Sequence, residues 1–175
     1  DEIKGSPDLL KPVWKQKIIM FDPSVSGNSN MWFMIIHTMV LGMDEGRKFM
    51  LELAKQEPVI TRDDRIIVDS VARGKYLVGV GASPSTVVEF ITVGATVDFI
   101  DIQEPWEISP GAGLLNAFSN PPHPNAQKFF VNWILSKEGL AILARGEWVP
   151  ARVDVPAEGV LPILFPRPQD PLTDV

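Results

Sequence analysis

The run Lys17-Ile18-Ile19-Met20-Phe21-Asp22-Pro23 decides the fold of this 175-residue chain. Its four consecutive apolar residues, closed by Asp-Pro, are typical of a short strand that is buried on both faces of a parallel sheet. Residues 24–30 then form a polar loop, and the apolar stretch from Met31 predicts a helix that ends at Gly42. A buried strand followed by a helix is the repeating unit of α/β proteins, so this stretch predicts that class.

The chain from residue 44 to residue 102 continues the alternation of helices and strands. An amphipathic pattern predicts a helix that Pro58 ends, and Thr61 with Asp64 resembles a capping box for the helix that follows. The predicted helices cover residues 44–57, 61–73 and 83–93, and the predicted strands cover residues 76–81 and 97–102. This order predicts a three-layer α/β sandwich with a mostly parallel central sheet.

The last third of the chain combines a broken helix with a proline-rich tail. A strand is predicted over residues 113–118, and a helix with a break over residues 124–145. Apolar residues recur at helical spacing on the core-facing side of this helix. They are Phe129, Phe130, Trp133 and Ile134. From Val149 onward, prolines at positions 150, 156, 162, 166, 168 and 171 predict an extended tail that packs along a surface or frays.

The amino-acid composition excludes several classes of function. The formal net charge is −6 at pH 7 and the 16 Lys and Arg residues are scattered, which argues against a nucleic-acid partner. The chain has no cysteine, so disulfides and thiolate metal sites are excluded. The longest apolar run, Met31 to Met43, is too short for a membrane-spanning helix, and no secretory signal is recognised in the sequence. The 45% of apolar residues predicts a folded globular domain.

No complete enzyme signature occurs in the sequence. Gly79-Val80-Gly81 follows a predicted strand, but Pro84 stands where a dinucleotide-binding fingerprint needs its third glycine. Residues 81–85 begin like a nucleophile elbow and end in serine instead of glycine. The two histidines form no convincing catalytic or zinc site, because His37 lies within an apolar helix and His123 lies between prolines.

Polar residues follow the first strand and mark a candidate binding site. Five of the nine residues from Asp22 to Asn30 are Ser or Asn, and Gly27 lets the backbone pass close to a ligand. The N–H groups and the positive dipole end of the next helix suit an oxyanion or a carboxylate. The alternative is that this loop only caps its own helix.

Ser83 and Ser85 repeat the same design at a second strand end. Because ligands of open α/β sheets gather at the carboxyl ends of the strands, we expect both loops to share one crevice, with Arg62 adding charge at its rim. The candidate ligand-binding residues are Ser24, Ser26, Gly27, Asn28, Ser29, Asn30, Arg62, Ser83 and Ser85. No catalytic residue, metal ligand or cofactor is predicted.

Several motifs resemble one known family. In chain order they are Asp8-Leu9-Leu10-Lys11-Pro12-Val13-Trp14-Lys15-Gln16-Lys17-Ile18, Asp22-Pro23-Ser24-Val25-Ser26-Gly27, Ala72-Arg73-Gly74-Lys75-Tyr76-Leu77-Val78-Gly79-Val80-Gly81, His123-Pro124-Asn125-Ala126 and Leu135-Ser136-Lys137-Glu138-Gly139. Each motif is loosely specific. Their succession, over roughly residues 8–155, resembles the ferric-type and related family of type II periplasmic binding proteins, which are solute-binding components of ABC importers.

The resemblance implies two α/β lobes that close on a ligand, with this chain as the C-terminal portion of the complete protein. The implied parts are a lead-in segment (1–14), the second, ligand-binding lobe (15–104), a return segment of the first lobe (105–149) and a Pro-rich C-terminal tail (150–175). It also implies a periplasmic or extracellular location, with a membrane-anchored lipoprotein as one form. The implied partner is an ABC permease of the inner membrane.

One difference from the family bears on the solute. Iron-binding members carry adjacent tyrosines after the strand that corresponds to residues 76–81, whereas this chain has Ala82-Ser83-Pro84-Ser85, and its one tyrosine is Tyr76. The hydroxyl groups of Ser83 and Ser85 favour a small anionic or polar solute over direct ligation of a ferric ion.

Two other functions stay open at this point, as does self-association. One is a serine-dependent hydrolase or transferase that uses Ser26 or Ser83, and the other is the effector-binding domain of a regulator. The aromatic helix with Phe129, Phe130 and Trp133 would expose an apolar patch if its partner lobe were absent, which predicts self-association of the chain, for example as a homodimer, or rearrangement of its C-terminal segment.

Overall fold

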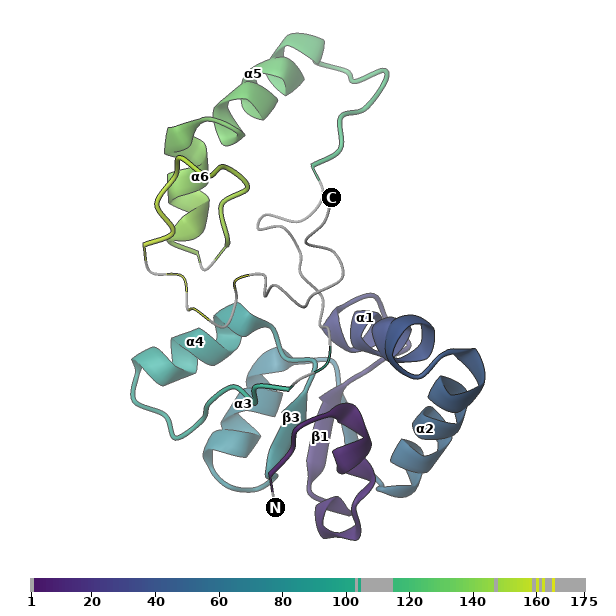
Figure 1. Ribbon diagram of the computed structural model, residues 1–175. Coiled ribbons are helices and arrows are strands. Elements are labelled where there is room, and N and C mark those ends of the chain that lie inside the picture. The colour runs from purple at the N-terminus through teal and green to yellow at the C-terminus, as the bar shows by residue number, and fades with distance from the viewer. Residues whose placement is uncertain are drawn as a thin grey trace. The chain divides into compact units, whose positions relative to one another are not determined.

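The fold was analysed in a computed structural model of the chain, which describes residues 2–102, 104, 115–146, 148–158, 160, 162 and 165 (Figure 1). The chain divides into two compact units. The first comprises residues 1–107 with 169–171, and the second comprises residues 108–168 with 172–175. Each unit is described by itself below.

A three-stranded parallel sheet forms the centre of the first unit. Its strands are β1 (Ile18–Phe21), β2 (Val59–Thr61) and β3 (Val78–Val80), in the spatial order β2-β1-β3. Ile19 of β1 is in register with Val59 on one side and with Gly79 on the other. The predicted α/β class with a parallel sheet is therefore confirmed, and residues 18–21 supply its central strand.

Helices cover both faces of this sheet (Figure 1). Two 3-10 turns precede the sheet, η1 (Ser6–Leu10) and η2 (Pro12–Trp14). The helices are α1 (Asn28–Ile35), which continues into the π-helical turn η3 (Ile36–Val40), then α2 (Met43–Lys55), α3 (Asp64–Ala72) and α4 (Pro84–Thr92). The layered sandwich that the sequence predicts is thus present in this unit.

Alternate residues of the strands enter two different cores. Ile18 and Met20 of β1, with Val78 of β3, belong to a cluster with Phe33, Ile36, Phe49 and Leu53 from the α1–α2 side. Ile19 points to the opposite face, where α3 packs against the sheet. A Cβ atom on Gly79 would lie 2.9 Å from a methyl carbon of Ile67, so the glycine lets α3 approach the sheet closely.

The segment from α1 to the start of α2 carries four exposed methionines. Met31, Met34, Met39 and Met43 are 41–65% exposed, whereas Met20 in the strand is 2% exposed. The π turn is closed by a hydrogen bond from the Leu41 N–H to the Ile36 carbonyl oxygen.

Several predicted boundaries are wrong by a few residues. The first helix begins at Asn28, three positions before the predicted start at Met31. Asp63, not Thr61, caps α3, because its carboxylate accepts hydrogen bonds from the N–H groups of Arg65 and Ile66. At the first turn, the Ser6 backbone N–H and hydroxyl both donate to the Glu104 carboxylate, which ties η1 to a residue 98 positions away.

The predictions of strands differ from the structure more clearly. Strand β2 was not predicted, and no strand forms over residues 97–102, where the backbone bonds locally instead, from Val97 to Ala95 and from Ile102 to Ile100. Residues 115–118 also form no strand, and the rest of that prediction, residues 113 and 114, lies outside the described residues.

The second unit contains the predicted broken helix, as α5 (Pro124–Ile134) and α6 (Lys137–Ala144). Ser136 sits at the break and caps α6 by accepting a hydrogen bond from the Gly139 N–H at 3.2 Å. The buried apolar side chains of this unit include Leu140, Ala144, Val155 and Val160. The two valines show that part of the proline-rich tail, within its described residues, is buried.

Helix α5 itself has no buried residue. Phe129 is 74% exposed and Phe130 is 51% exposed, so the prediction that they face a core is wrong for this unit. Trp133 and Ile134 are half-buried.

Candidate functional site

The three parallel strands end at the same edge of the sheet, and a helix begins after each of them. Helix α1 follows β1, α3 follows β2 and α4 follows β3. We call this region the carboxyl edge and define it as residues 21–30, 61–66 and 80–86. Both loops proposed from the sequence lie in it, as does Arg62.

Asp22, the first residue after β1, organises the carboxyl edge. One carboxylate oxygen accepts hydrogen bonds from the Ser24 backbone N–H at 2.9 Å and from the Ser24 hydroxyl at 2.6 Å. The other oxygen accepts from the Arg62 Nε at 2.8 Å. Ser24, followed by Arg62, lowers the pKa of Asp22 to about 2, so the carboxylate stays ionised at neutral pH.

Arg62 extends from this carboxylate into solvent. Its side chain is 68% exposed and that of Asp22 is 16% exposed. Only the Nε atom bonds to Asp22, and the Nη atoms make no hydrogen bond within the part of the chain that the structure describes. Asp22 therefore fixes the direction of the guanidinium while most of its donors stay available.

The start of α1 is locked against the end of β3. The Asn28 amide donates to the Ala82 carbonyl oxygen at 3.4 Å, and the Ser29 hydroxyl donates to the Val80 carbonyl oxygen at 3.4 Å. Gly81 has a φ of +78°, and a Cβ atom there would lie 2.9 Å from the Ser29 backbone nitrogen and still closer to its hydroxyl. The contact requires glycine, and Ser29 is 0% exposed beneath it.

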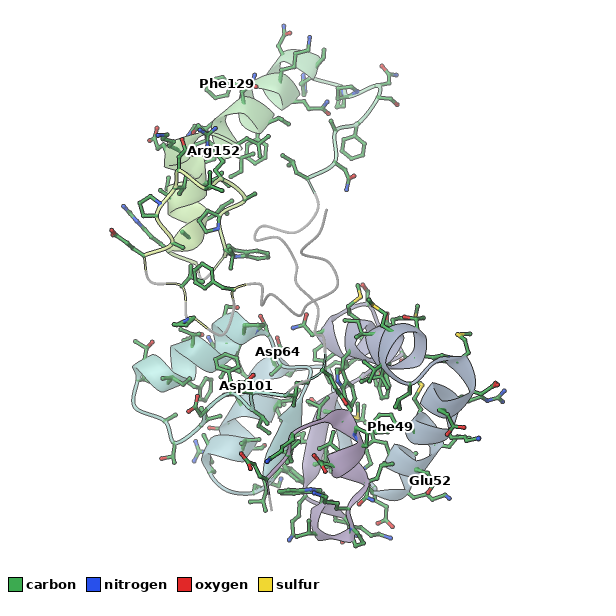
Figure 2. The ribbon with its side chains drawn as sticks, in the orientation of Figure 1. Phe49, Glu52, Asp64, Asp101, Phe129 and Arg152 are labelled. Carbon is green, nitrogen blue, oxygen red and sulfur yellow. The ribbon has the colours of Figure 1, made fainter. Side chains whose placement is uncertain are left out.

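The starts of α3 and α4 are joined by Asp64, which is labelled in Figure 2. Its carboxylate accepts a hydrogen bond from the Ser83 N–H at 3.2 Å, and burial raises its pKa. Behind it, Arg65 on α3 donates to both carboxylate oxygens of Glu89 on α4, at 2.7 and 2.6 Å. The start of α3 is thus already capped by a carboxylate of the protein itself, that of Asp63, and the Asp64 carboxylate lies beside the start of α4.

Most of the predicted site residues lie together at this edge. Ser24 is tied to Arg62 through Asp22, and Asn30 donates to the Pro23 carbonyl oxygen at 3.1 Å. The hydroxyl groups of Ser83 and Ser85 are 2.9 Å apart at the start of α4. Ser26 and Gly27 are exposed, and Gly27 forms the N-terminal cap position of α1 without any side-chain bond. Ser29 alone among the nine candidates is buried, so in this structure it serves packing.

Sequence reasoning missed the two carboxylates that organise the edge, Asp22 and Asp64. Each stands directly at the end of a strand or the start of a helix, which is the one signal in the sequence that could have drawn attention to them. Their partners, Arg62 and Ser83, are 40 and 19 positions away along the chain, so the pairing itself depends on the fold.

The described part of the chain contains no candidate metal site, no hydrogen bond from Ser26 or Ser83 to a histidine and no candidate membrane-spanning helix. No group of three or more His, Asp or Glu residues there could hold a metal ion. Neither Ser26 nor Ser83 has a hydrogen bond to a histidine among the described residues, and Ser83 instead pairs with Ser85. Within the same residues, no helix has the length and apolarity required to cross a membrane.

Comparison with known proteins gives one match. The sequence model of the family described as bacterial extracellular solute-binding protein matches residues 7–163, which is nearly the whole chain and includes every residue of the carboxyl edge. No curated protein and no solved structure matches the chain. The chain belongs to the bacterial extracellular solute-binding protein family.

Proposed function

We propose that this protein is the solute-binding component of an ABC importer, which captures a small polar or anionic solute between two lobes and delivers it to a permease of the inner membrane. In this proposal residues 15–104 form the ligand-binding lobe, with the carboxyl edge as its binding surface. Membership of a solute-binding family supports the general role. The observation that carries the site is the start of three helices at one edge of a parallel sheet.

The start of α1 is the part of the edge best suited to a solute oxyanion. Asp63 caps α3, and Asp64 accepts a hydrogen bond from the backbone N–H of Ser83, the N-cap residue of α4. No carboxylate of the described residues accepts a hydrogen bond from the start of α1 at Gly27. Among the described residues, no hydrogen bond occupies the backbone N–H groups of Asn28 and Asn30. Unoccupied N–H groups at the positive end of a helix attract carboxylate or phosphate oxygens.

Side chains around α1 would then supply direction and selectivity. The Arg62 guanidinium, held by Asp22, offers its Nη donors, and Ser26 offers a hydroxyl from the exposed loop. A neutral hydrogen bond contributes about 1 kcal/mol to affinity, and one that involves a charged group contributes about 1.5–3 kcal/mol. Asp22 has a positioning role in this proposal, because its bonds to Ser24 and Arg62 are complete without a ligand.

The role consists of binding and release, without a bond-breaking step. Closure of two lobes around the solute would present a defined surface to the permease. The same role places the protein outside the cytoplasmic membrane, either free in the periplasm or attached to the membrane surface as a lipoprotein.

A thermal-shift screen followed by calorimetry tests the site. The panel contains small carboxylates, phosphate and phosphonates, amino acids, sugars and polyamines, and the best binder is then titrated into wild-type protein and variants. We expect Ser26→Ala to weaken binding about tenfold and Arg62→Ala to weaken it roughly ten- to a hundredfold. Thr92→Ala, at the far end of α4, is the matched control and should bind like wild type.

Unchanged affinity in both edge variants would remove the carboxyl edge as the binding surface. A panel in which polyamines alone bind would exclude an anionic solute. The transport role has a separate test, since deletion of the gene should abolish cellular uptake of the identified solute, and uptake that continues unchanged would contradict that role.

A further inference from the structure

The C-terminal end of α2 is tied to the segment that precedes β1. The Gln56 carbonyl oxygen accepts a hydrogen bond from the Gln16 N–H at 2.8 Å. The Gln56 side-chain amide donates to the Leu10 carbonyl oxygen, also at 2.8 Å. Gln56 thus holds both ends of the short segment that contains η2. We call residues 9–16 together with residues 53–57 the α2 junction.

The backbone of the α2 junction has an uncommon conformation at two positions. Gln16 has a φ of +60° and Glu57 has a φ of +56°, values that residues other than glycine rarely adopt. The two side chains meet, because the Gln16 amide donates to the Glu57 carboxylate at 2.6 Å. Lys15 forms an ion pair with the other oxygen of that carboxylate at 2.8 Å. Such backbone conformations persist only where the surrounding contacts determine them, so the geometry of this junction is well defined.

Two polar groups are buried in the α2 junction without a hydrogen-bond partner among the described residues. They are the indole Nε1 of Trp14 and the amide Oε1 of Gln56, and both residues are only 9% exposed. Trp14 belongs to the same apolar cluster as Leu9 and Leu53, and Leu53 lies one turn before Gln56 at the end of α2. Burial of a polar group without a partner costs free energy, so nearly all such groups in folded proteins are hydrogen-bonded.

The two groups need opposite partners. The Trp14 indole N–H can only donate a hydrogen bond, and the Gln56 Oε1 can only accept one. A single ligand that satisfies both must therefore accept one hydrogen bond and donate another. An ionised carboxylate only accepts and an ammonium group only donates, whereas water does both and fits a very small cavity. The chemistry of the pair thus selects water.

We propose that the α2 junction binds one internal water molecule, which accepts a hydrogen bond from Trp14 Nε1 and donates one to Gln56 Oε1. The water completes the link between η2 and the end of α2, because it joins Trp14 to the residue that already bonds to Leu10 and Gln16. A buried water of this kind is part of the structure and is costly to remove. The inference is independent of the proposed transport role, since the junction shares no residue with the carboxyl edge.

Nuclear magnetic resonance of the whole wild-type chain tests the site directly. The chain has five tryptophans, and the indole N–H signal of Trp14 is the one that disappears in Trp14→Phe. We expect this signal to show a dipolar cross-peak to water. We also expect its proton to exchange with D2O at least about a hundredfold more slowly than that of Trp148, which is 42% exposed. Slow exchange excludes proton transfer as the source of the cross-peak.

Two results of this measurement would overturn the proposal. A slowly exchanging Trp14 N–H without a cross-peak to water would show that the group is buried without the water. A Trp14 N–H that exchanges as fast as that of Trp148 would show that the indole is open to bulk solvent.

A double-mutant cycle tests whether the two groups act through one water. Trp14→Phe removes the donor, and Gln56→Met removes the acceptor with little change in side-chain length. Either substitution alone breaks the bridge, so we expect their effects on the unfolding equilibrium constant to depart from additivity by about fivefold. Trp32→Phe with Gln56→Met is the matched control. Trp32 packs against the same apolar cluster and its Nε1 is not among the unpaired buried atoms of the described residues, so these effects should add.

Additive effects in the cycle of Trp14 and Gln56 would contradict a shared water. Non-additive effects without the cross-peak to water would mean that the two side chains bond to each other directly, which also contradicts the proposal.

Discussion

Helices α2 and α5 carry the same aromatic and aliphatic pattern but lie in different surroundings. In α2 the residues Phe49, Met50 and Leu53 occupy positions i, i+1 and i+4, and Phe49 and Leu53 are 3% and 1% exposed. In α5, Phe129 and Phe130 begin the same spacing and stay 74% and 51% exposed. The pattern therefore shows which face of a helix is suited to burial. Whether that face is buried depends on the sheet, which the first unit provides and the second does not provide among its described residues.

The largest contrast should come from truncating the two phenylalanines. Phe49→Ala removes a fully packed ring and leaves a cavity, so we expect a loss of about 3–5 kcal/mol in the free energy of unfolding. Phe129→Ala should change it by less than about 1 kcal/mol when measured where the protein is monomeric, since the ring is mostly in water. Chemical denaturation of both variants, followed by circular dichroism, measures the difference. Equal losses would mean that the Phe129 ring is covered by another part of the chain.

A second, smaller effect should appear where α1 meets β3. Gly81→Ala introduces a Cβ atom into the Ser29 contact and also forces an alanine into a φ of +78°. We expect a loss of about 2–4 kcal/mol together with weaker solute binding. Gly94→Ala separates the two causes, because Gly94 has a φ of +83° with nothing within 4 Å. This control should lose only about 1 kcal/mol, and a similar loss at both positions would show that the close approach to Ser29 is unimportant.

The smallest effect concerns the acid side of the stability curve. The pKa of Asp22 is about 2 in the fold, below the ordinary value of 3.8, so its ionised form favours the folded state. That contribution is fully present above pH 3.8 and is lost as the pH falls through about 2. The midpoint of chemical denaturation is lower at about pH 2 than at neutral pH, and Asp22→Asn should make this difference smaller than it is in the wild type. Arg62→Met should narrow it in part, because Ser24 still stabilises the carboxylate. Identical pH profiles for wild type and Asp22→Asn would refute this role.

Elements that arise from local sequence patterns could be predicted, whereas elements that depend on distant partners could not. Strand β1 and the helices α2 and α4 follow from patterns of neighbouring residues, and their predicted positions agree with the structure within a few residues. Strand β2 has three residues, of which Val59 and Ile60 are 41% and 49% exposed, so it has no run of buried residues to reveal it. The strand predicted at residues 97–102 shows the reverse error. An apolar pattern in the sequence does not ensure that a neighbouring strand is available for pairing.

The candidate site was predictable to a similar extent. The position of its loops at strand ends follows from the α/β order, and the structure places them there. The burial of Ser29 could not be predicted, because it depends on Gly81, which belongs to a different strand end. The same holds for the bond between Asp22 and Arg62, since residues so far apart in the chain meet only after the sheet has formed.

The four exposed methionines between α1 and the start of α2 affect how the protein responds to oxidation. A peroxide that reaches the protein will oxidise exposed thioethers first and convert them to sulfoxides. At Met31, Met34, Met39 and Met43 the added oxygen points into water and leaves the packed side chains untouched. At Met20, in the central strand, the same oxygen would enter the core without a hydrogen-bond partner. Oxidation of the four exposed methionines should therefore leave the packing around β1 intact, whereas oxidation of Met20 would disrupt it.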